Sequence, residues 1–306
     1  MAGHDTGDPF WINAPMPQPA APSIFRPSLR KRRLERAAGN FSAHDFLHRR
    51  AAADIVERLE TVQRTFKNAL FYGPGAPLLA EMLTEAAAVE HFTVAGESAV
   101  FLRSQGVSAP IEASACALPF ADGGFDLVAS VMSLHAENDL PGALAEAHRV
   151  LSADGLFIGT FPAEKTLGVL RQALRDAEAN LTGGLSPRVS PFVAIKDAGG
   201  LLQRAGFALP VADTQPVTVA YGDPLRLLHD LRGMGETAAL AAGAQGALRR
   251  DVLAATLAAL HGQEILFELL TITGWSPHES QQKPLKPGSG KVSLADAIRG
   301  AAPQSN

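Results

Sequence analysis

Residues 69–77 read ALFYGPGAP. A short apolar run typical of a buried β-strand passes into a turn that contains Gly73 and Gly75, and Pro77 follows where the start of a helix tolerates proline. A strand, a glycine turn and a helix in this order predict a βα unit of an open α/β sheet. Ligands of such sheets bind outside the carboxyl ends of the strands, so this turn is where we expect a cofactor site.

Hydrophobic periodicity extends the same alternation in both directions. Before the turn, Leu47, Ile55 and Leu59 lie on one stripe of an amphipathic helix. Strands are predicted by apolar runs at 69–72, 91–95, 111–113, 125–134, 156–161, 209–213, 217–221 and within 264–275. Helices are predicted at about 77–88, 98–104, 141–151, 164–180, 195–205, 224–232 and 249–261. Because helices and strands alternate, we expect one α/β domain with a parallel sheet covered on both faces.

Composition divides the chain into a domain and two flanking segments. The predicted domain covers residues 43–294, within which 163–206 form a helical cover and turn over the functional edge of the sheet. Residues 1–42 are predicted to be a mobile Pro-rich leader and basic arm, since five prolines lie within 1–22. Residues 295–306 are expected to be a short polar tail.

The composition is that of a soluble globular protein. The chain has 306 residues, 46% of them hydrophobic, which is enough for a buried core. It contains no run of about 20 uncharged apolar residues such as a membrane-spanning helix needs. The first residues, MAGHDTGDPFW, lack the basic and apolar regions of a secretory signal. The expected location is the cytoplasm, with a peripheral place at the inner membrane as the alternative.

Positive charge is concentrated in one segment, although the net charge of −4 argues against general nucleic-acid binding. The stretch RPSLRKRRLER (26–36) contains Arg30, Lys31, Arg32 and Arg33. This basic arm can meet an acidic protein partner, an anionic lipid surface or only solvent. The sequence leaves these three interpretations open.

Other polar residues allow fewer conclusions. The single cysteine, Cys116, can form neither an internal disulfide nor a zinc framework, and we interpret it as a small buried side chain rather than a nucleophile. His44 and His48 have helical metal-ligand spacing but no evident third ligand, so no metal site is predicted. Asp139 is expected to cap the helix that follows it. The neighbours His278, Glu279 and Ser280 are interpreted as a structural lock or a partner contact.

Six strings spread over the chain resemble one family. They are LPFADGGFDLV (118–128), SLHAENDLPGAL (133–144), GGLSPRVSPF (183–192), LLQRAGF (201–207), DLRGMGE (230–236) and GWSPHESQ (274–281). Together they resemble the class I S-adenosylmethionine-dependent methyltransferases, in the branch of the arginine-hydroxylase assembly factor of respiratory complex I. The resemblance implies a Rossmann-like, mostly parallel seven-stranded sheet with helices on both faces. It also implies S-adenosylmethionine as cofactor and a complex I subunit as partner.

The resemblance places the expected cofactor contacts on numbered residues. The family's D-x-G-x-G-x-G turn aligns with 71–77, so Phe71 replaces the leading acid and Pro77 the last glycine. The ribose-binding acid aligns with Ala95, and Glu97 can substitute two residues later. The adenine-side aspartate aligns with Ser114. The predicted cofactor residues are Tyr72, Gly73, Gly75, Ala95, Glu97, Ser114, Ala115 and Met132.

His135 is the candidate catalytic base, because it follows a predicted strand at the mouth of this pocket. Each lost charged hydrogen bond costs about 1.5–3 kcal/mol, so two missing acids weaken cofactor binding by about a hundredfold or more. Three hypotheses follow from this eroded motif. The chain modifies or escorts a complex I subunit, it is a conventional methyltransferase acting on a small molecule or carrier-bound acid, or it is a pseudoenzyme that serves as a scaffold.

Overall fold

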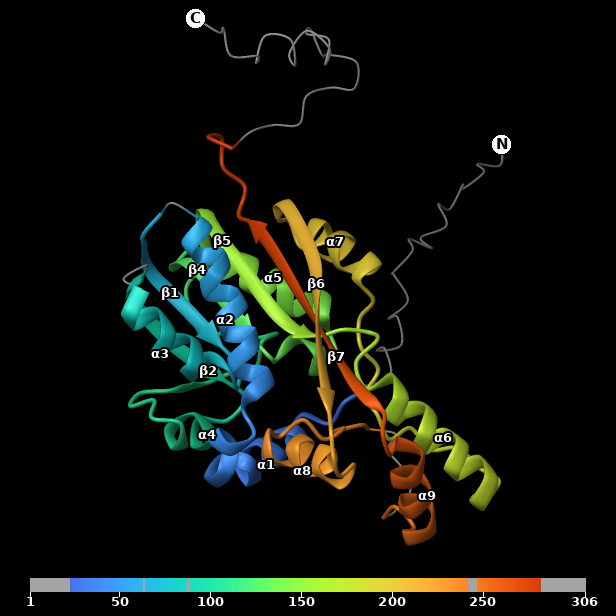
Figure 1. The fold of residues 1–306 in the computed structure, drawn as a ribbon. Helices are drawn as coiled ribbons and strands as arrows, with labels where there is room; N and C mark the ends of the chain where they lie inside the picture. The colour runs from blue at the N-terminus through green and yellow to red at the C-terminus, as the bar shows by residue number, and fades with distance from the viewer. Residues whose placement is uncertain (1–22, 63, 87–88, 242–246, 282–306) are drawn as a thin grey trace, which may run out of the picture.

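The fold is described from a computed structural model, which places residues 23–62, 64–86, 89–241 and 247–281 (Figure 1). The predicted leader at 1–22 and the predicted tail at 295–306 lie outside these described residues. No helix in the described part of the chain is both long and apolar enough to cross a membrane.

A single seven-stranded sheet forms the centre of the molecule, in the order β3-β2-β1-β4-β5-β7-β6. Neighbouring strands from β3 to β5 pair in parallel, whereas β7 is antiparallel to both β5 and β6. The strands are β1 (Phe66–Tyr72), β2 (Val89–Gly96), β3 (Ile111–Glu112), β4 (Phe125–Val131), β5 (Leu151–Pro162), β6 (Ala208–Ala220) and β7 (Glu264–Trp275). The mostly parallel, Rossmann-like sheet predicted from the sequence is thereby confirmed.

Helices cover both faces of the sheet and the edge where its parallel strands end. On one face lie α2 (Phe46–Thr61) and α3 (Ala76–Ala86), and on the other α5 (Leu140–Val150) and α7 (Ile195–Arg204). Each face has its own apolar core, the first around Ile55 and Phe71 and the second around Leu144 and Phe157. Two further helices, α6 (Gly168–Thr182) and α9 (Arg250–Leu260), pack together beside the sheet (Figure 1).

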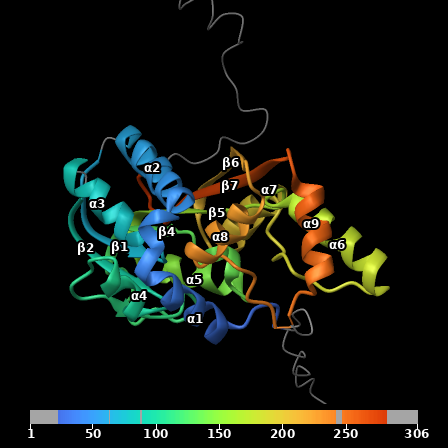
Figure 2. The same ribbon diagram turned by 60° about the horizontal axis from the view of Figure 1, so that its bottom comes forward.

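The carboxyl edge of the parallel strands is covered by short helices. Figure 2 turns this edge forward and shows α1 (Pro27–Ala37), α4 (Ala99–Ser104) and α8 (Leu225–Gly233) across it. Two short 3-10 helices, η1 (Ala38–Ala43) and η2 (Leu134–Ala136), complete the edge. This is the edge where ligands of open α/β sheets bind.

The basic arm at 26–36 is part of the folded body, so the described domain begins before residue 43, where the sequence analysis placed its start. Pro27 opens helix α1, which α4 and α8 contact. Leu34 on its inner face is 1% exposed and Arg30 is 6% exposed. Lys31 and Arg33 are half-buried, and Arg32 is exposed. The arm packs because its inner face carries apolar residues at helical spacing.

The structure also corrects the prediction of two strands at 209–213 and 217–221. Both belong to the single strand β6, which runs through Pro216 and pairs only with β7 among the described residues. Proline is tolerated there because an edge strand has one row of backbone groups without a ladder partner. Pro216 therefore indicates a strand at the edge of the sheet and does not separate two strands.

Candidate functional site

The glycine turn after β1 packs closely against β4. Gly73 has a φ of +102°, a conformation that favours glycine. A Cβ added to Gly73 would lie 2.6 Å from the carbonyl oxygen of Val131, and one added to Gly75 would lie 2.4 Å from Val131 Cγ1. The turn therefore needs both glycines to approach β4. The amide of Gly73 also donates to the Ala95 carbonyl at 3.0 Å, which ties the turn to β2.

Four predicted cofactor residues frame this turn. Tyr72 is buried, and its hydroxyl donates to the Ala113 carbonyl at 2.9 Å. Burial, with the nearby charges of Glu97 and Glu137, raises the pKa of Tyr72, so its phenol stays neutral.

Ala95 and Ala115 are buried in the core, whereas Ser114 is exposed. The Ser114 hydroxyl accepts a hydrogen bond from the Cys116 amide at 3.2 Å. Of these three residues, only Ser114 offers a side-chain polar group to a ligand.

Glu97 is the first residue beyond β2, where a ligand-binding acid is expected. Its Oε1 accepts hydrogen bonds from the Ser133 hydroxyl at 3.0 Å and from Arg30 Nε at 3.1 Å. Its Oε2 is buried and has no hydrogen-bond partner among the described residues. The position that aligns with the ribose-binding acid is Ala95, which lies inside the strand and has an apolar side chain. The carboxylate at this strand end therefore comes from Glu97.

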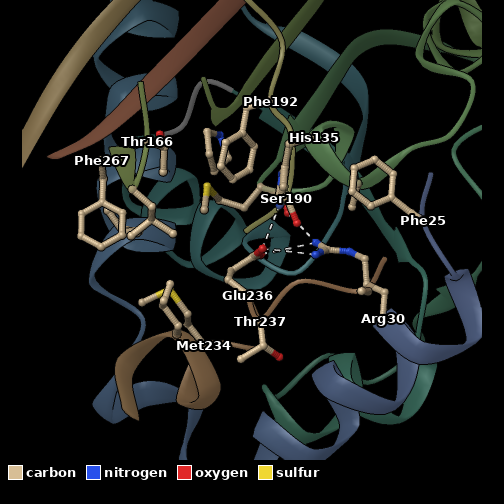
Figure 3. Close-up of a pocket in the computed structure, with 17 residues that line it drawn as sticks. Phe25, Arg30, His135, Thr166, Ser190, Phe192, Met234, Glu236, Thr237 and Phe267 are labelled. Carbon is tan, nitrogen blue, oxygen red and sulfur yellow. Dashed lines mark hydrogen bonds and ion pairs between the residues drawn. The ribbon is translucent and has the colours of Figure 1, made fainter. Parts of the chain in front are cut away.

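Arg30 reaches into the same site from helix α1 (Figure 3). Its Nη1 donates to Glu236 Oε2 at 3.2 Å and its Nη2 to Glu236 Oε1 at 3.4 Å, so Glu236 binds the guanidinium through both oxygens. Nη2 also donates to the carbonyl of Met132 at 3.0 Å. We call Glu97, Glu236 and the Met132 carbonyl the guanidinium clamp. Burial alone would lower the pKa of Arg30, but the charges of Glu236 and Glu97 raise it.

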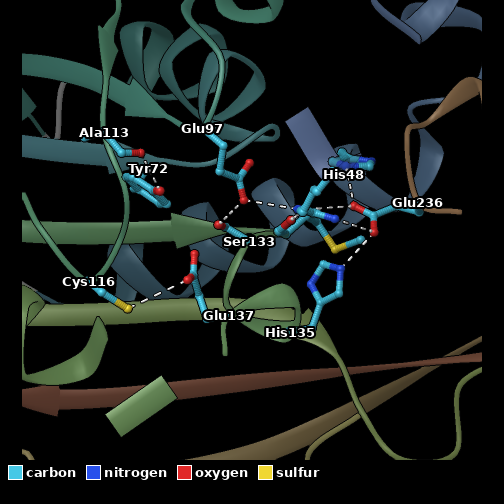
Figure 4. Close-up of polar contacts among 11 residues, drawn as sticks. His48, Tyr72, Glu97, Ala113, Cys116, Ser133, His135, Glu137 and Glu236 are labelled. Atoms are coloured by element: carbon cyan, nitrogen blue, oxygen red, sulfur yellow. Dashed lines mark hydrogen bonds and ion pairs between the residues drawn. The ribbon is translucent and has the colours of Figure 1, made fainter. Parts of the chain in front are cut away.

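Two histidines lie near Glu236, one at each of its carboxylate oxygens (Figure 4). His135 Nε2 lies 2.8 Å from Glu236 Oε2, and the fully buried His48 has its Nε2 3.5 Å from Glu236 Oε1, where the geometry is not that of a hydrogen bond. Burial acts to raise the pKa of Glu236, but Arg30 and then His135 hold it well below its ordinary value. His135 thus lies beyond β4, as predicted, with Nε2 committed to Glu236.

Glu137 and Cys116 form a second polar pair at this edge (Figure 4). Burial, with the charge of Glu97 as the next cause, raises the pKa of Glu137 to about 7. The Cys116 thiol lies 3.7 Å from Glu137 Oε2 and 3.3 Å from the Asp139 carbonyl. Burial and the Glu137 charge raise the pKa of Cys116 to about 12, so the half-buried thiol stays protonated at neutral pH. A protonated thiol is a poor nucleophile.

The remaining candidate residues have structural contacts. His44 bonds Asp230 at 2.8 Å, so His44 and His48 do not share a ligand. Asp139 caps α5 by accepting from the Gly142 amide at 2.9 Å, as predicted.

The segment with His278, Glu279 and Ser280 ends at Gln281. The Gln281 amide group donates to Asp154 at 3.0 Å and to the Ser276 carbonyl at 2.8 Å. The bond to Asp154 ties the segment to the beginning of β5, whereas the bond to Ser276 lies within the segment.

Two cavities with shared lining residues adjoin the guanidinium clamp. The smaller, of about 30 Å³, is lined by Arg30, Met132, His135 and Glu236, with Phe25 and Phe192 beside them (Figure 3). The larger, of about 610 Å³, lies between α1, α6, α8 and α9. Both are lined by Leu167, Ser190, Phe192, Leu231, Glu236 and Thr237. A third cavity, of about 510 Å³, lies by α3 and the 105–108 loop.

Sequence reasoning missed three residues of the site. Glu236 and Glu137 stand inside DLRGMGE and SLHAENDLPGAL, which carry the family resemblance, but neither acid had a role assigned. Arg30 was placed in the basic arm, for which an acidic partner, a lipid surface and solvent all stayed open. For Glu137 and Glu236, the sequence signal was the position of an acidic residue just after the predicted end of a strand or a helix.

Comparison with known proteins agrees with a methyltransferase-like fold. Residues 71–159 match the family model described as a methyltransferase domain. The arginine-hydroxylase NDUFAF5, mitochondrial, of Danio rerio is 37% identical over 288 residues, which cover 90% of this chain and 89% of that protein. The chain belongs to the NDUFAF5 family. This family membership places it in the class I methyltransferase superfamily, as the six strings predicted.

More distant proteins share the fold with this NDUFAF5 homologue. A malonyl-[acyl-carrier protein] O-methyltransferase of Methylovorus sp. (strain MP688) is 32% identical over 222 residues, covering 67% of this chain and 72% of that protein. A solved structure of the Haloferax volcanii Trm112 methyltransferase activator with its methyltransferase contains a chain that matches with a TM-score of 0.51 at 13% identity. The match covers 82% of this chain and 99% of that one. At this identity the structural match supports the fold alone.

Proposed function

We propose that this protein binds S-adenosylmethionine at the carboxyl ends of β1 and β2 and acts in respiratory complex I assembly, by modifying or escorting a subunit. The observation that carries the proposal is the buried Glu97 Oε2, which has no partner among the described residues at the end of β2. A ribose diol needs an acid at this place to accept hydrogen bonds from its hydroxyl groups. Membership of the NDUFAF5 family supports the role in assembly.

The residues at these strand ends fit the cofactor. A Cβ on Gly96 would lie 3.5 Å from the Gly73 amide nitrogen, so the glycine turn and the residue before Glu97 are in contact. The Gly73 amide donates to the Ala95 carbonyl at 3.0 Å and the Gly75 amide to the Val131 carbonyl at 3.3 Å, so the turn offers a ligand close approach and not free amides. The amino-acid head would lie against Gly73 and Gly75, the ribose would bind Glu97, and the adenine side would face Ser114. When bound, S-adenosylmethionine supplies an electrophilic methyl group.

The protein's own residues orient the acid and provide a proton carrier. Ser133 and Arg30 both bind Glu97 Oε1, which fixes the carboxylate and leaves Oε2 for a ligand. Glu137 has a pKa of about 7, raised by burial and by Glu97, so its carboxyl group can take up or release a proton near neutral pH. We assign this proton-carrying role to Glu137 before His135, because His135 Nε2 is engaged with Glu236.

Two alternative functions have specific support. The tight packing of the Gly73 turn on β4, with Tyr72 bonded across to Ala113, favours a scaffold that binds a partner without cofactor chemistry. The similarity to the Methylovorus enzyme favours a conventional methyltransferase that acts on a small molecule or a carrier-bound acid. Both alternatives keep the same fold, which does not by itself determine function.

A calorimetric titration with S-adenosylmethionine separates these functions. We expect micromolar binding by the full chain, which would exclude the cofactor-free scaffold. Glu97→Gln should weaken binding about 10- to 100-fold, because one charge-assisted hydrogen bond contributes about 1.5–3 kcal/mol. Glu90→Gln, an exposed change on the same strand, is the matched control. Absence of heat at millimolar ligand would contradict both cofactor-dependent functions.

The outer face of α1 is the proposed contact with the partner. Arg32 is exposed there, and the half-buried Lys31 and Arg33 also contact Glu112 and the Thr237 carbonyl of the same chain. We propose that these three residues meet an acidic surface of a complex I subunit in the cytoplasm, at the inner membrane. Arg30 takes no part in this contact, because it is buried. The double variant Lys31→Gln/Arg32→Gln should lose recovery of the subunit in a pull-down, whereas the exposed Arg175→Gln on α6 should retain it. Equal recovery from both variants would remove the docking role.

A further inference from the structure

The 610 Å³ cavity between α1, α6, α8 and α9 has mainly aliphatic walls. Helix α6 contributes Leu170 and Leu174, α8 contributes Leu231, and α9 contributes Leu253. Small-molecule sites occupy about 300–1,000 Å³ and are lined mostly by apolar side chains, so this cavity has the size and the lining of a ligand site. The leucine side chains favour a ligand with a hydrocarbon chain.

Three arginines line the same cavity. Arg26 and Arg33 lie at the beginning and in the middle of α1, and Arg188 lies in the segment between α6 and α7. We call Arg26 and Arg33 the arginine pair of α1. Arg26 is exposed to solvent, whereas Arg33 and Arg188 are half-buried. The cavity therefore combines an apolar lining with cationic side chains.

The arginine pair of α1 is not balanced by acidic side chains of the described chain. Arg33 Nη1 donates to the Thr237 carbonyl at 2.6 Å, and neither Arg33 nor Arg26 forms an ion pair with a described carboxylate. Burial, with the charges of Arg36 and Arg32, lowers the pKa of Arg33. Since lost hydration and neighbouring cations both disfavour a charged guanidinium, an anion beside Arg33 would be stabilised.

The two carboxylates nearest to the cavity are already engaged. Among its described lining residues, Glu236 alone carries a carboxyl group, and both oxygens of that group bind Arg30. Glu178, on α6, accepts a hydrogen bond from Arg188 Nε at 2.5 Å. The positive charge of the arginine pair thus remains for an anionic ligand.

We propose that this cavity binds a fatty acid, with its carboxylate at the arginine pair of α1 and its hydrocarbon chain among the leucines of α6, α8 and α9. A free single chain fits better than a bilayer surface, because Leu170 and Leu231 are buried and do not form an exposed apolar face. None of the described residues that line the cavity belongs to the glycine turn or to the end of β2. The fatty-acid site therefore lies apart from the proposed cofactor site and does not depend on it.

The test is a calorimetric titration of the full chain with three probes below their micelle-forming concentrations, in the absence of S-adenosylmethionine. Dodecanoate should bind with a stoichiometry of one. Octanoate should bind about a hundredfold more weakly, because each methylene removed from water tightens binding about fourfold. Dodecyltrimethylammonium has the same chain and the opposite charge, and it should bind at least tenfold more weakly than dodecanoate.

Variants locate the two ends of the ligand. Arg26→Gln, an exposed change, and the double variant Arg26→Gln/Arg33→Gln should weaken dodecanoate binding progressively, the double variant at least tenfold. Leu253→Trp, which adds bulk to the α9 wall, should also weaken it at least tenfold. The exposed Arg175→Gln on α6, which does not line the cavity, should behave as the wild type.

A measurement on the wild type needs no variant. Dodecanoate should slow amide hydrogen exchange in residues 168–182 and 250–260, which form α6 and α9. Unchanged exchange there, equal affinity for dodecanoate and dodecyltrimethylammonium, or competition by S-adenosylmethionine would overturn the proposal. Absence of saturable dodecanoate binding would also overturn it, whether the chain then bound anionic phospholipid vesicles or an apolar segment of a partner protein. Loss of S-adenosylmethionine binding with intact dodecanoate binding would count only against the proposed function.

Discussion

The protonation of Glu137 gives the prediction with the clearest magnitude. Its pKa is about 7 in the folded protein against an ordinary value of 4.5, because the side chain is largely withdrawn from water and Glu97 lies near. The folded state therefore binds the proton more tightly than the unfolded state, and the resulting stabilisation is complete below pH 4.5. It is lost as the pH rises to 7. A difference of about 2.5 pKa units corresponds to about 3 kcal/mol.

Glu137→Gln removes this titration and keeps the shape of the side chain. As the pH rises, the wild type loses the stabilisation from protonated Glu137, whereas the variant has none to lose. The difference in free energy of unfolding, variant minus wild type, should therefore increase by about 3 kcal/mol between pH 4.5 and pH 8, mostly below pH 7. Urea denaturation followed by circular dichroism at half-unit pH steps measures it. The exposed Glu90→Gln controls for the loss of one carboxylate. A difference that stays constant to within about 0.5 kcal/mol over this range would refute the assigned burial of Glu137.

Three further predictions address the turn, the clamp and the thiol. Gly75→Ala should destabilise the fold by about 1–3 kcal/mol in urea denaturation, since its Cβ would meet β4 at 2.4 Å, whereas Gly39→Ala, with nothing within 4 Å, should cost less than about 0.5 kcal/mol. Glu236→Leu should lower stability by about 3–5 kcal/mol because it leaves buried Arg30 with one carboxylate, and a loss below about 1 kcal/mol would contradict the clamp. Cys116, with a pKa raised to about 12, should react with iodoacetamide at pH 8 at least about a hundredfold more slowly than free cysteine, and reach the free rate in denaturing urea.

The fold was predictable because its signals are local. The apolar run before Gly73, the alternation of periods and the cap at Asp139 each act within a few residues of sequence, and the structure follows them. Strand β6 was divided at Pro216 because sequence alone does not show that a strand lies at the edge of a sheet. Phe71 was seen only as a missing acid, whereas in the structure it is 0% exposed in the core and stacks on Phe92.

The site was less predictable because its contacts are distant in sequence. Arg30 is 67 residues from Glu97 and 206 from Glu236, so a basic run that looks like a solvated face contains a buried guanidinium. Only the fold brings α1, the end of β2 and the segment after α8 to one edge. Glu97 was within reach of sequence reasoning, because its place after β2 depends on one strand alone.

A crystal structure of the full chain grown with S-adenosylmethionine tests the central claim most directly. We expect the two ribose hydroxyl groups to lie within hydrogen-bond distance of Glu97, with Oε2 accepting from at least one of them. We also expect the Gly73 turn to contact the amino-acid head of the ligand. A ligand bound at another place would contradict the proposed site. An empty site at the carboxyl ends of β1 and β2, in crystals grown with saturating S-adenosylmethionine, would contradict it equally.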